Sequence, residues 1–268
     1  MLKDITLGQY FPGESIVHRL DPRTKIILVV VYIVALFCAK FVVSYALMMA
    51  VLIACIQLSG VGYKAIFRGM KPVVIVIVIT AILNLFYNSS GTLLVHVWKL
   101  SIYTGGVRMA AMMIIRILML ISGTFLLTYT TSPIQLTDAI ERLLGGLKKL
   151  HLPIHELAMM MSIALRFIPT LIEETDKIMS AQKARGADFE SGKLIEKAKA
   201  LVPLLVPLFV SAFRRADELA TAMECRCYHG DEGRTRMKQL VYAKRDFVAL
   251  ILGAAVLAAV LVLRHFAL

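Results

Sequence analysis

The stretch IILVVVYIVALFCAKFVVSYALMMAVLIACIQL, residues 26–58, decides the fold of this chain. It runs for 33 residues with Lys40 as its only charge. A helix needs about 20 apolar residues to cross a hydrocarbon core of about 30 Å, so the run is too long for one span. We therefore predict two short membrane helices joined by a tight turn near Lys40.

Composition places the whole chain in the membrane class. Of its 268 residues, 59% are hydrophobic, and the mean hydropathy is +0.76. Soluble domains are less apolar than this. Three further apolar runs, residues 73–87, 107–129 and 247–263, predict additional spans. We expect an all-α polytopic membrane protein with about five transmembrane helices plus long cytosolic helices.

The distribution of charge divides the chain into three predicted segments. Residues 1–129 form an N-terminal membrane region with about four spans, residues 130–246 form cytosolic or interfacial helices, and residues 247–268 form a C-terminal transmembrane helix. A charged segment as long as the middle one is not expected to be an unstructured loop.

The formal net charge of +12 marks one side of the membrane rather than a nucleic-acid partner. Membrane proteins carry an excess of Lys and Arg on the cytoplasmic side. With the N-terminus in the cytosol, 25 of these residues fall on the cytosolic side, and three, Lys40, Lys99 and Arg264, fall on the other. We expect a multi-pass cell-membrane protein with a cytoplasmic N-terminus, in contact with the lipid bilayer and with no nucleic acid.

Two features of the membrane region leave alternatives open. Arg116 lies deep in an apolar helix, and no Asp or Glu lies in any predicted span. It is either a functional intramembrane charge or a structural one that hydrogen-bonds backbone carbonyls or Asn84. Residues 88–106 alternate too weakly to predict strands, so we expect an external loop or interfacial segment anchored by Trp98.

Local helix signals occur throughout residues 130–246. Ser132, Pro133 and Gln135 have the spacing of a capped helix start, and the following amphipathic helix is expected on the inner membrane surface. Two longer helices should follow, from Pro153 to Arg185 and from Leu194 to Arg226. Three prolines inside these helices are expected to kink them: Pro169, Pro203 and Pro207.

Apolar stripes on the two long helices predict that the helices pack together or cross. A strip of small residues, Ala212, Ala216 and Ala220, would allow a second helix to approach closely. Further apolar residues are candidates for a partner surface, and the methionines among them suit variable partners. The candidates are Met159, Met160, Met161, Leu201, Leu205, Leu208, Phe209, Ala212 and Ala216.

Each long helix ends in a similar segment. SAQKARGAD, residues 180–188, and TAMECRCYH, residues 221–229, place Arg185 and Arg226 at the same position, 41 residues apart. A single arginine at a helix end is most simply a solvated charge that complements the helix dipole. Two arginines, each between small residues, instead suggest docking contacts with carboxylates or helix carbonyls of a partner.

Signals for catalysis or cofactor binding are weak. The chain has no P-loop motif, so we expect it to bind no ATP itself, and its spans lack paired carboxylates or an activated nucleophile. Cys225, Cys227 and His229 lack the usual metal-site spacing, and small residues at a helix end are the simpler interpretation. We expect no cofactor, no metal and no enzymatic activity.

Several motifs together resemble a known family. HRLDPRTK (residues 18–25), ALRFIP (164–169) and AQKARGAD (181–188) look like the transmembrane T-component of energy-coupling factor (ECF) vitamin transporters. The similarity continues through YTGGVRMAAMMIIR (103–116) and TTSP (130–133) and extends over nearly the whole chain.

The resemblance implies a non-catalytic scaffold with two kinds of partner. In that family two Ala-Arg-Gly motifs dock into a pair of ATP-binding ATPase subunits, and a separate S-component binds the vitamin. Carried over, Ala184, Arg185 and Gly186 match the first motif fully, whereas Cys225, Arg226 and Cys227 keep only the arginine of the second. The apolar partner surface, in residues 159–161 and 201–216, would then meet the S-component.

Three other functions stay open from the sequence. The nearest is the T-component of a dedicated cobalt or nickel transporter of the same family. A membrane scaffold without transport, which recruits cytosolic proteins through its basic helices, belongs to a different class. A membrane-embedded enzyme is the third, and the lack of a catalytic constellation counts against it.

Overall fold

A computed structural model describes residues 10–87, 92–97, 100–146, 153–187, 189, 194–230 and 239–266. The chain divides into two compact units. We call Gly8–Ala139 with Leu240–Leu268 the bundle unit, and Met1–Leu7 with Ile140–Gln239 the crossed-helix unit.

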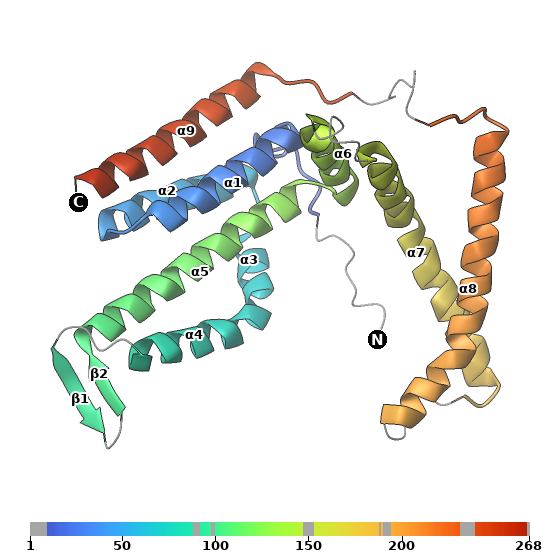
Figure 1. The fold of residues 1–268 in the computed structure, drawn as a ribbon, viewed down its shortest axis with the longest axis horizontal. Helices are drawn as coiled ribbons and strands as arrows, with labels where there is room; N and C mark the ends of the chain where they lie inside the picture. The colour runs from blue at the N-terminus through green and yellow to red at the C-terminus, as the bar shows by residue number, and fades with distance from the viewer. Residues whose placement is uncertain are drawn as a thin grey trace. The chain divides into compact units, whose positions relative to one another are not determined.

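The bundle unit is helical apart from one small hairpin (Figure 1). A short 3-10 turn, Lys71–Val73, joins its third and fourth helices. Its elements are α1 (Pro22–Cys38), α2 (Val42–Ser59), α3 (Tyr63–Met70), α4 (Val74–Tyr87), β1 (Leu93–Val97), β2 (Leu100–Tyr103), α5 (Thr104–Thr130) and α9 (Lys244–His265).

The predicted turn near Lys40 is confirmed. Helix α1 begins at Pro22, behind an Asp21 side chain that accepts a hydrogen bond from the Arg23 N–H, and it ends before an extended Ala39. Helix α2 then runs back to Gly60, whose φ of +70° suits glycine at a helix end. The apolar run is therefore a helical hairpin.

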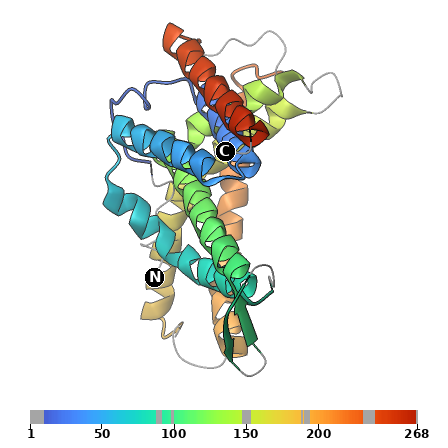
Figure 2. The same cartoon turned by 90° about the vertical axis from the view of Figure 1, so that its left-hand side faces the viewer.

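Helix α5 lies at the centre of the bundle unit, against α1, α2, α3 and α4, and α9 packs along α1 (Figure 2). Close approach of helices is visible at Gly123, where a Cβ atom would lie 2.7 Å from the Tyr32 ring. The fully buried apolar side chains include Leu36, Met48, Met119, Tyr129 and Val260.

The expected loop between the third and fourth predicted spans is instead an antiparallel β-hairpin. Strand β1 pairs with β2 from Leu93 opposite Tyr103 to Val97 opposite Leu100, with an irregularity after Leu93. The predicted anchor Trp98 lies outside the described residues.

Five helices are long and apolar enough to cross a membrane, which confirms the predicted fold class. The set differs from the expected one. Helix α1 has 17 residues and is too short to be counted, whereas α7, which lies in the segment expected to be cytosolic or interfacial, is included. The five are Val42–Ser59, Tyr63–Tyr87, Thr104–Thr130, Ile154–Ala184 and Lys244–His265.

The crossed-helix unit contains the two long helices α7 (Ile154–Ala184) and α8 (Leu194–Glu224), and α6 (Pro133–Leu144) leads into it. The predicted capping box at the start of α6 is present: the Gln135 N–H donates to Ser132 Oγ at 3.4 Å, and the Ser132 N–H donates to Gln135 Oε1 at 3.3 Å. Figure 1 shows α7 and α8 crossing, with their C-termini at opposite ends of the pair.

Candidate functional site

A polar cluster joins α7 to α8. Glu174 on α7 accepts hydrogen bonds from the Ser211 hydroxyl and from the Arg215 guanidinium on α8, the latter at 2.9 Å. A carboxylate that is partly withdrawn from water needs hydrogen-bond donors to replace the lost water. Because both donors to Glu174 lie on α8, the contact restricts the distance between the two helices and also their sliding past each other. The cluster therefore links the two helices where they cross.

The first arginine end is a capped helix terminus. Arg185 is the C-cap residue that directly follows α7, and Gly186 comes next with a φ of +89°. The Gly186 N–H donates to the Lys183 carbonyl, and the Ala187 N–H donates to the Gln182 carbonyl, both at 3.0 Å. This pair of hydrogen bonds is the Schellman motif, in which a left-handed residue closes the helix.

The second arginine end has the same geometry. Cys227, with a φ of +55°, is the one non-glycine residue of the described chain in the left-handed region. The Cys227 N–H donates to the Glu224 carbonyl at 2.9 Å, and the Tyr228 N–H donates to the Met223 carbonyl at 3.1 Å. The second motif lacks the glycine of the first, and Cys227 adopts the same left-handed turn in its place.

Both arginines are displayed outward. Arg185 and Arg226 are exposed, and neither guanidinium makes a hydrogen bond or ion pair with any residue that the structure describes. Their flanking residues Ala184, Gly186, Cys225 and Cys227 are exposed too. The two helices therefore present two equivalent cationic ends, one at each end of the pair.

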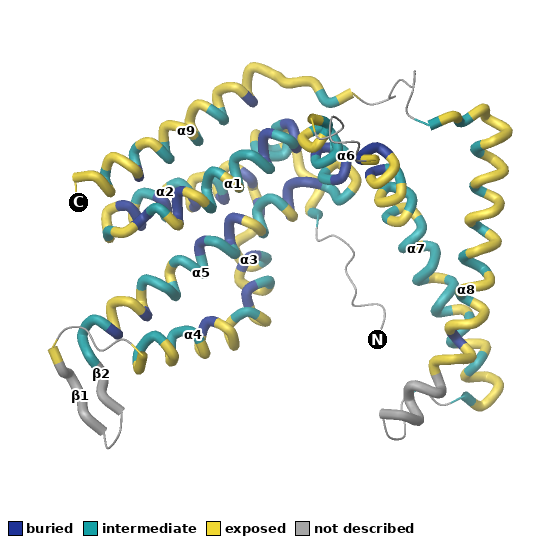
Figure 3. Tube along the Cα trace, in the orientation of Figure 1, coloured by how far each residue is buried: buried dark blue, intermediate teal, exposed yellow. Residues whose placement is uncertain are grey.

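A stripe of exposed apolar residues follows α8 over residues 201–213. Figure 3 shows mainly exposed residues along the described part of this helix. Leu201, Leu205 and Phe209 of the predicted partner surface belong to it, and Leu208 is half-buried. Sequence reasoning missed four exposed members that recur at helical spacing, Val202, Val206, Val210 and Phe213. The i, i+4 repeat of the three valines was the signal that would have found them.

The predicted α7 surface and the alanine strip differ from expectation in part. Met160 and Met161 are exposed, and Met159 is half-buried. The strip was expected to receive α7, but Ala216 and Ala220 are exposed and only Ala212 is half-buried. Helix α7 instead contacts the neighbouring face that carries Ser211 and Arg215, because polar partners decide the rotation of α8.

The three prolines predicted to kink the long helices all lie inside continuous helix. Pro169 is within α7, and Pro203 and Pro207 are within α8. Their role as kinks stays a prediction.

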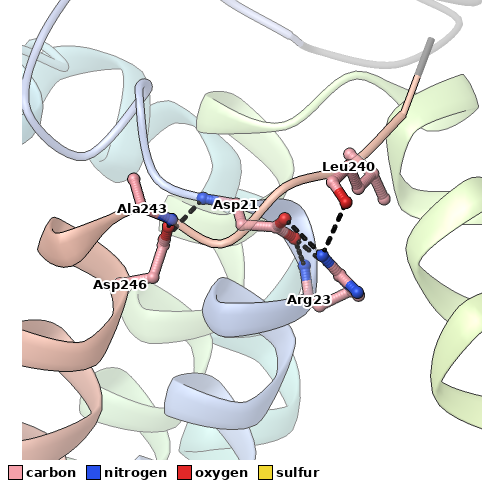
Figure 4. Close-up of polar contacts among 5 residues, drawn as sticks. All are labelled: Asp21, Arg23, Leu240, Ala243 and Asp246. Atoms are coloured by element: carbon pink, nitrogen blue, oxygen red, sulfur yellow. Dashed lines mark hydrogen bonds and ion pairs between the residues drawn. The ribbon is translucent and has the colours of Figure 1, made fainter.

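A buried ionic junction in the bundle unit was not predicted from the sequence. Asp246 of α9 accepts hydrogen bonds from the backbone N–H groups of Asp21 and Ala243, each at 2.8 Å (Figure 4). Arg23 donates to both carboxylate oxygens of Asp21 and, at 3.0 Å, to the Leu240 carbonyl. These contacts tie the start of α9 to the start of α1.

Lys25 extends this junction to the end of α5. Its ammonium group, in a side chain that is almost fully buried, donates to the Thr130 carbonyl at 2.8 Å and to the His18 carbonyl at 3.1 Å. Carbonyls at the end of a helix favour a cation. Through Asp21, Arg23 and Lys25, the HRLDPRTK motif therefore holds the start of α1 to the start of α9 and to the end of α5.

Arg116 hydrogen-bonds other residues of the bundle unit. Its Nε donates to the Tyr45 hydroxyl at 2.8 Å, and it makes a longer contact of 3.4 Å with the Ala39 carbonyl. The Phe37 ring lies 5.9 Å from the guanidinium carbon. Of the two expected partners a backbone carbonyl is found, whereas Asn84 donates to the Thr80 carbonyl of its own helix.

The described residues contain no group of three or more His, Cys, Asp and Glu side chains placed to hold a metal ion. His229 hydrogen-bonds the Cys227 carbonyl at 2.7 Å, which fixes its ring at the end of the helix.

Known proteins are similar to this chain over most of its length. A family model described as cobalt transport protein (CbiQ) matches residues 13–237. A relative from Clostridium kluyveri is 56% identical over 250 residues, which cover 93% of this chain and 93% of the relative. A relative from Bacillus subtilis is 48% identical over 261 residues, which cover 97% and 98%. Both relatives are named energy-coupling factor transporter transmembrane protein EcfT.

The chain belongs to this EcfT family. The resemblance drawn from the sequence motifs is confirmed, and the chain is the transmembrane component of an energy-coupling factor transporter. The five long apolar helices agree with a multi-pass membrane protein.

Proposed function

We propose that this chain is the scaffold that couples ATP hydrolysis by a pair of ATPase subunits to reorientation of a vitamin-binding S-component. The observation that carries the proposal is the pair of equivalent ends, in which Arg185 and Arg226 each precede a left-handed residue in a Schellman motif. Two alike ends at opposite ends of one helix pair suit two alike or identical partners.

The arginine ends fit docking by their chemistry. Each guanidinium is exposed and lies where the helix ends, so it reaches past its own helix without a competing internal partner among the described residues. Arginine offers a planar fork of donors for carboxylates and carbonyls, and each charge-assisted bond contributes about 1.5 to 3 kcal/mol. In this proposal Ala184, Gly186, Cys225 and Cys227 give each arginine room to enter a groove.

The S-component would contact the apolar stripe of α8 and the methionines of α7. A continuous exposed apolar surface on a long helix indicates a membrane or protein partner. Closing of the ATPases would move the two arginine ends, and the Glu174 cluster would carry this motion to the stripe because it joins the helices at their crossing. Crosslinks from Leu205 and Phe209 that reach the S-component support this path, and crosslinks that reach lipid alone contradict it.

The proposal includes an arrangement in the membrane. Residues 1–129 and 247–268 form the membrane-spanning region, residues 130–246 form the cytosolic or interfacial coupling helices, and the N-terminus lies in the cytoplasm. The excess of Lys and Arg on that side supports this orientation. The exposed thiols of Cys225 and Cys227 offer the test: a membrane-impermeant maleimide should label them in broken membranes and leave them unlabelled in intact cells.

This subunit is proposed to perform no chemistry and to bind no cofactor. The family model is described by cobalt transport, but a dedicated cobalt or nickel transporter is not favoured, because the relatives that share 48% to 56% of their residues with this chain are named for energy coupling. A scaffold without transport would leave the ATPase activity independent of this chain.

Co-purification with the cognate ATPase pair tests the docking step. The full chain in detergent is compared with Arg185→Glu, Arg226→Glu and the double variant, with Arg214→Glu as the matched control, since Arg214 is an exposed arginine of α8 away from either end. Each single reversal should weaken the complex and the double reversal should abolish it. Retention of the complex by the double variant would show that the arginines are solvated helix ends.

A further inference from the structure

The short helix α3 carries an unusual outer face. Lys64 and Arg68 are exposed on it together with Tyr63 and Phe67, whose exposed fractions are 47% and 67%, and Lys71, the first residue of the following 3-10 turn, is exposed next to them in the chain. No Asp or Glu occurs in residues 59–72. None of the three cations makes a hydrogen bond or ion pair with the residues that the structure describes.

The other face of α3 is fixed against α5. Ile66 and Met70 are buried in the core, and the Tyr129 hydroxyl donates to the Ala65 carbonyl at 3.3 Å. At Gly69 an added Cβ atom would lie 2.8 Å from the side chains of Phe125 and Tyr129. This packing prevents rotation of α3, so its cations and aromatic rings stay on the outside.

The place of α3 in the chain puts this face at a membrane boundary. Helix α4, which follows, exposes large apolar side chains along its length, among them Ile75 and Leu83. The 3-10 turn at Lys71–Val73 contains Pro72, and Figures 1 and 2 show that α3 leaves the line of α4 there. A helix that enters lipid after a bend, preceded by a basic and aromatic helix, is typical of the headgroup region.

The spacing of the cations also points to an external anion. Lys64 and Arg68 are four residues apart on one helix face, where like charges repel. Because no carboxylate lies in residues 59–72, an anion outside the chain would relieve this repulsion. Tyrosine and phenylalanine beside the cations suit a ligand that has both a charged head and apolar chains.

We propose that α3 is a binding site for acidic phospholipid, in which Lys64, Arg68 and Lys71 contact headgroup phosphates and Tyr63 and Phe67 lie at the level of the headgroups. The leaflet, which would be the cytoplasmic one, rests on the proposed orientation. The binding itself requires neither the ATPases nor the S-component, so its failure and a failure of the proposed function are separable.

Native mass spectrometry of the full chain in detergent tests the site. The chain is incubated with equal amounts of phosphatidylglycerol and phosphatidylcholine of the same acyl chains, and retained lipid is counted. The wild type should retain phosphatidylglycerol preferentially, and Lys64→Gln/Arg68→Gln/Lys71→Gln should reduce that retention by about tenfold or more. Lys64→Arg/Lys71→Arg should retain the lipid, because the charge is kept.

The matched control neutralises two exposed cations of the same unit outside α3, Arg108→Gln/Arg264→Gln, and should behave as wild type. A second arm adds inorganic phosphate, which should not displace the lipid. Equal retention of the two lipids, an unchanged triple variant, an equal loss in the control, or displacement by phosphate would each overturn the proposal.

Discussion

The carboxylate of Asp246 accepts a hydrogen bond at 2.8 Å from the backbone N–H of Asp21, a residue 225 positions earlier in the chain. The same carboxylate accepts the Ala243 N–H, so one side chain caps α9 and holds the start of α1. The last helix of the chain is thereby fixed to the first, although nothing in the local sequence of either predicts the pairing.

Removal of the Asp246 carboxylate should destabilise the bundle unit. Asp246→Ala leaves two backbone N–H groups without their acceptor in a site where Asp246 is 1% exposed, and each lost partner costs about 1 to 3 kcal/mol. We expect a fall in the thermal unfolding temperature of the detergent-solubilised chain. Asp217→Ala, at an exposed position of α8, is the control, and an equal effect of the two changes would refute a capping role.

Two substitutions at the left-handed positions should change the free energy of unfolding in opposite directions: Gly186→Ala should lower it, and Cys227→Gly should raise it. Gly186→Ala places a β-carbon at a φ of +89° and should lower the free energy of unfolding by about 1 kcal/mol, although the surrounding space is open. Cys227→Gly should raise it by up to about 1 kcal/mol, because the left-handed φ of +55° no longer carries a steric cost.

Gly62→Ala is the control for this pair, since Gly62 has a φ of −64° and open space around a Cβ atom. Thermal unfolding of the three variants measures the effect. A Gly186→Ala change as mild as Gly62→Ala would mean that the left-handed turn is not maintained in solution.

Arg116 and Tyr45 should be energetically coupled. Their hydrogen bond of 2.8 Å lies between membrane helices α5 and α2, where such bonds contribute about 0.6 to 2 kcal/mol. A double-mutant cycle of Arg116→Leu and Tyr45→Phe, read by SDS-induced unfolding, should give a coupling energy in that range. Additive single effects would indicate that Arg116 has a role other than holding these helices together.

The Glu174 cluster should control how α7 and α8 pack against each other more than it controls the folding of either helix. Glu174→Gln weakens the bonds to Ser211 and Arg215 and should lower disulfide crosslinking between cysteine pairs placed across the crossing. Glu173→Gln, at the exposed neighbouring position, should leave it unchanged. Equal crosslinking in both variants would mean that apolar packing alone sets the crossing.

The sequence predicted the features that depend on local chemistry. The capping box of Ser132 and Gln135 and the turn near Lys40 both follow from residues close together in the sequence. Features that depend on distant partners were not predictable. The Asp21–Asp246 contact and the Arg116–Tyr45 bond need a three-dimensional arrangement that no periodic pattern encodes.

Cys227 is a local feature that its residue type does not predict. Its conformation is local, but a cysteine carries no preference for positive φ, so the residue type misleads. The six-residue hydrogen-bond pattern around it imposes the turn instead. The repeat of the arginine at the same place in the two segments was the better signal, because it reflects the shared geometry of the ends.

The most direct test of the account is ATP-driven vitamin uptake into proteoliposomes that contain this chain, its ATPase pair and its S-component. Wild type and the Arg214→Glu control should both transport, whereas Arg185→Glu/Arg226→Glu should abolish uptake while the variant chain still inserts and unfolds at the wild-type temperature. Uptake by the double variant at the wild-type rate would contradict the claim that the two arginine ends couple the ATPases to transport.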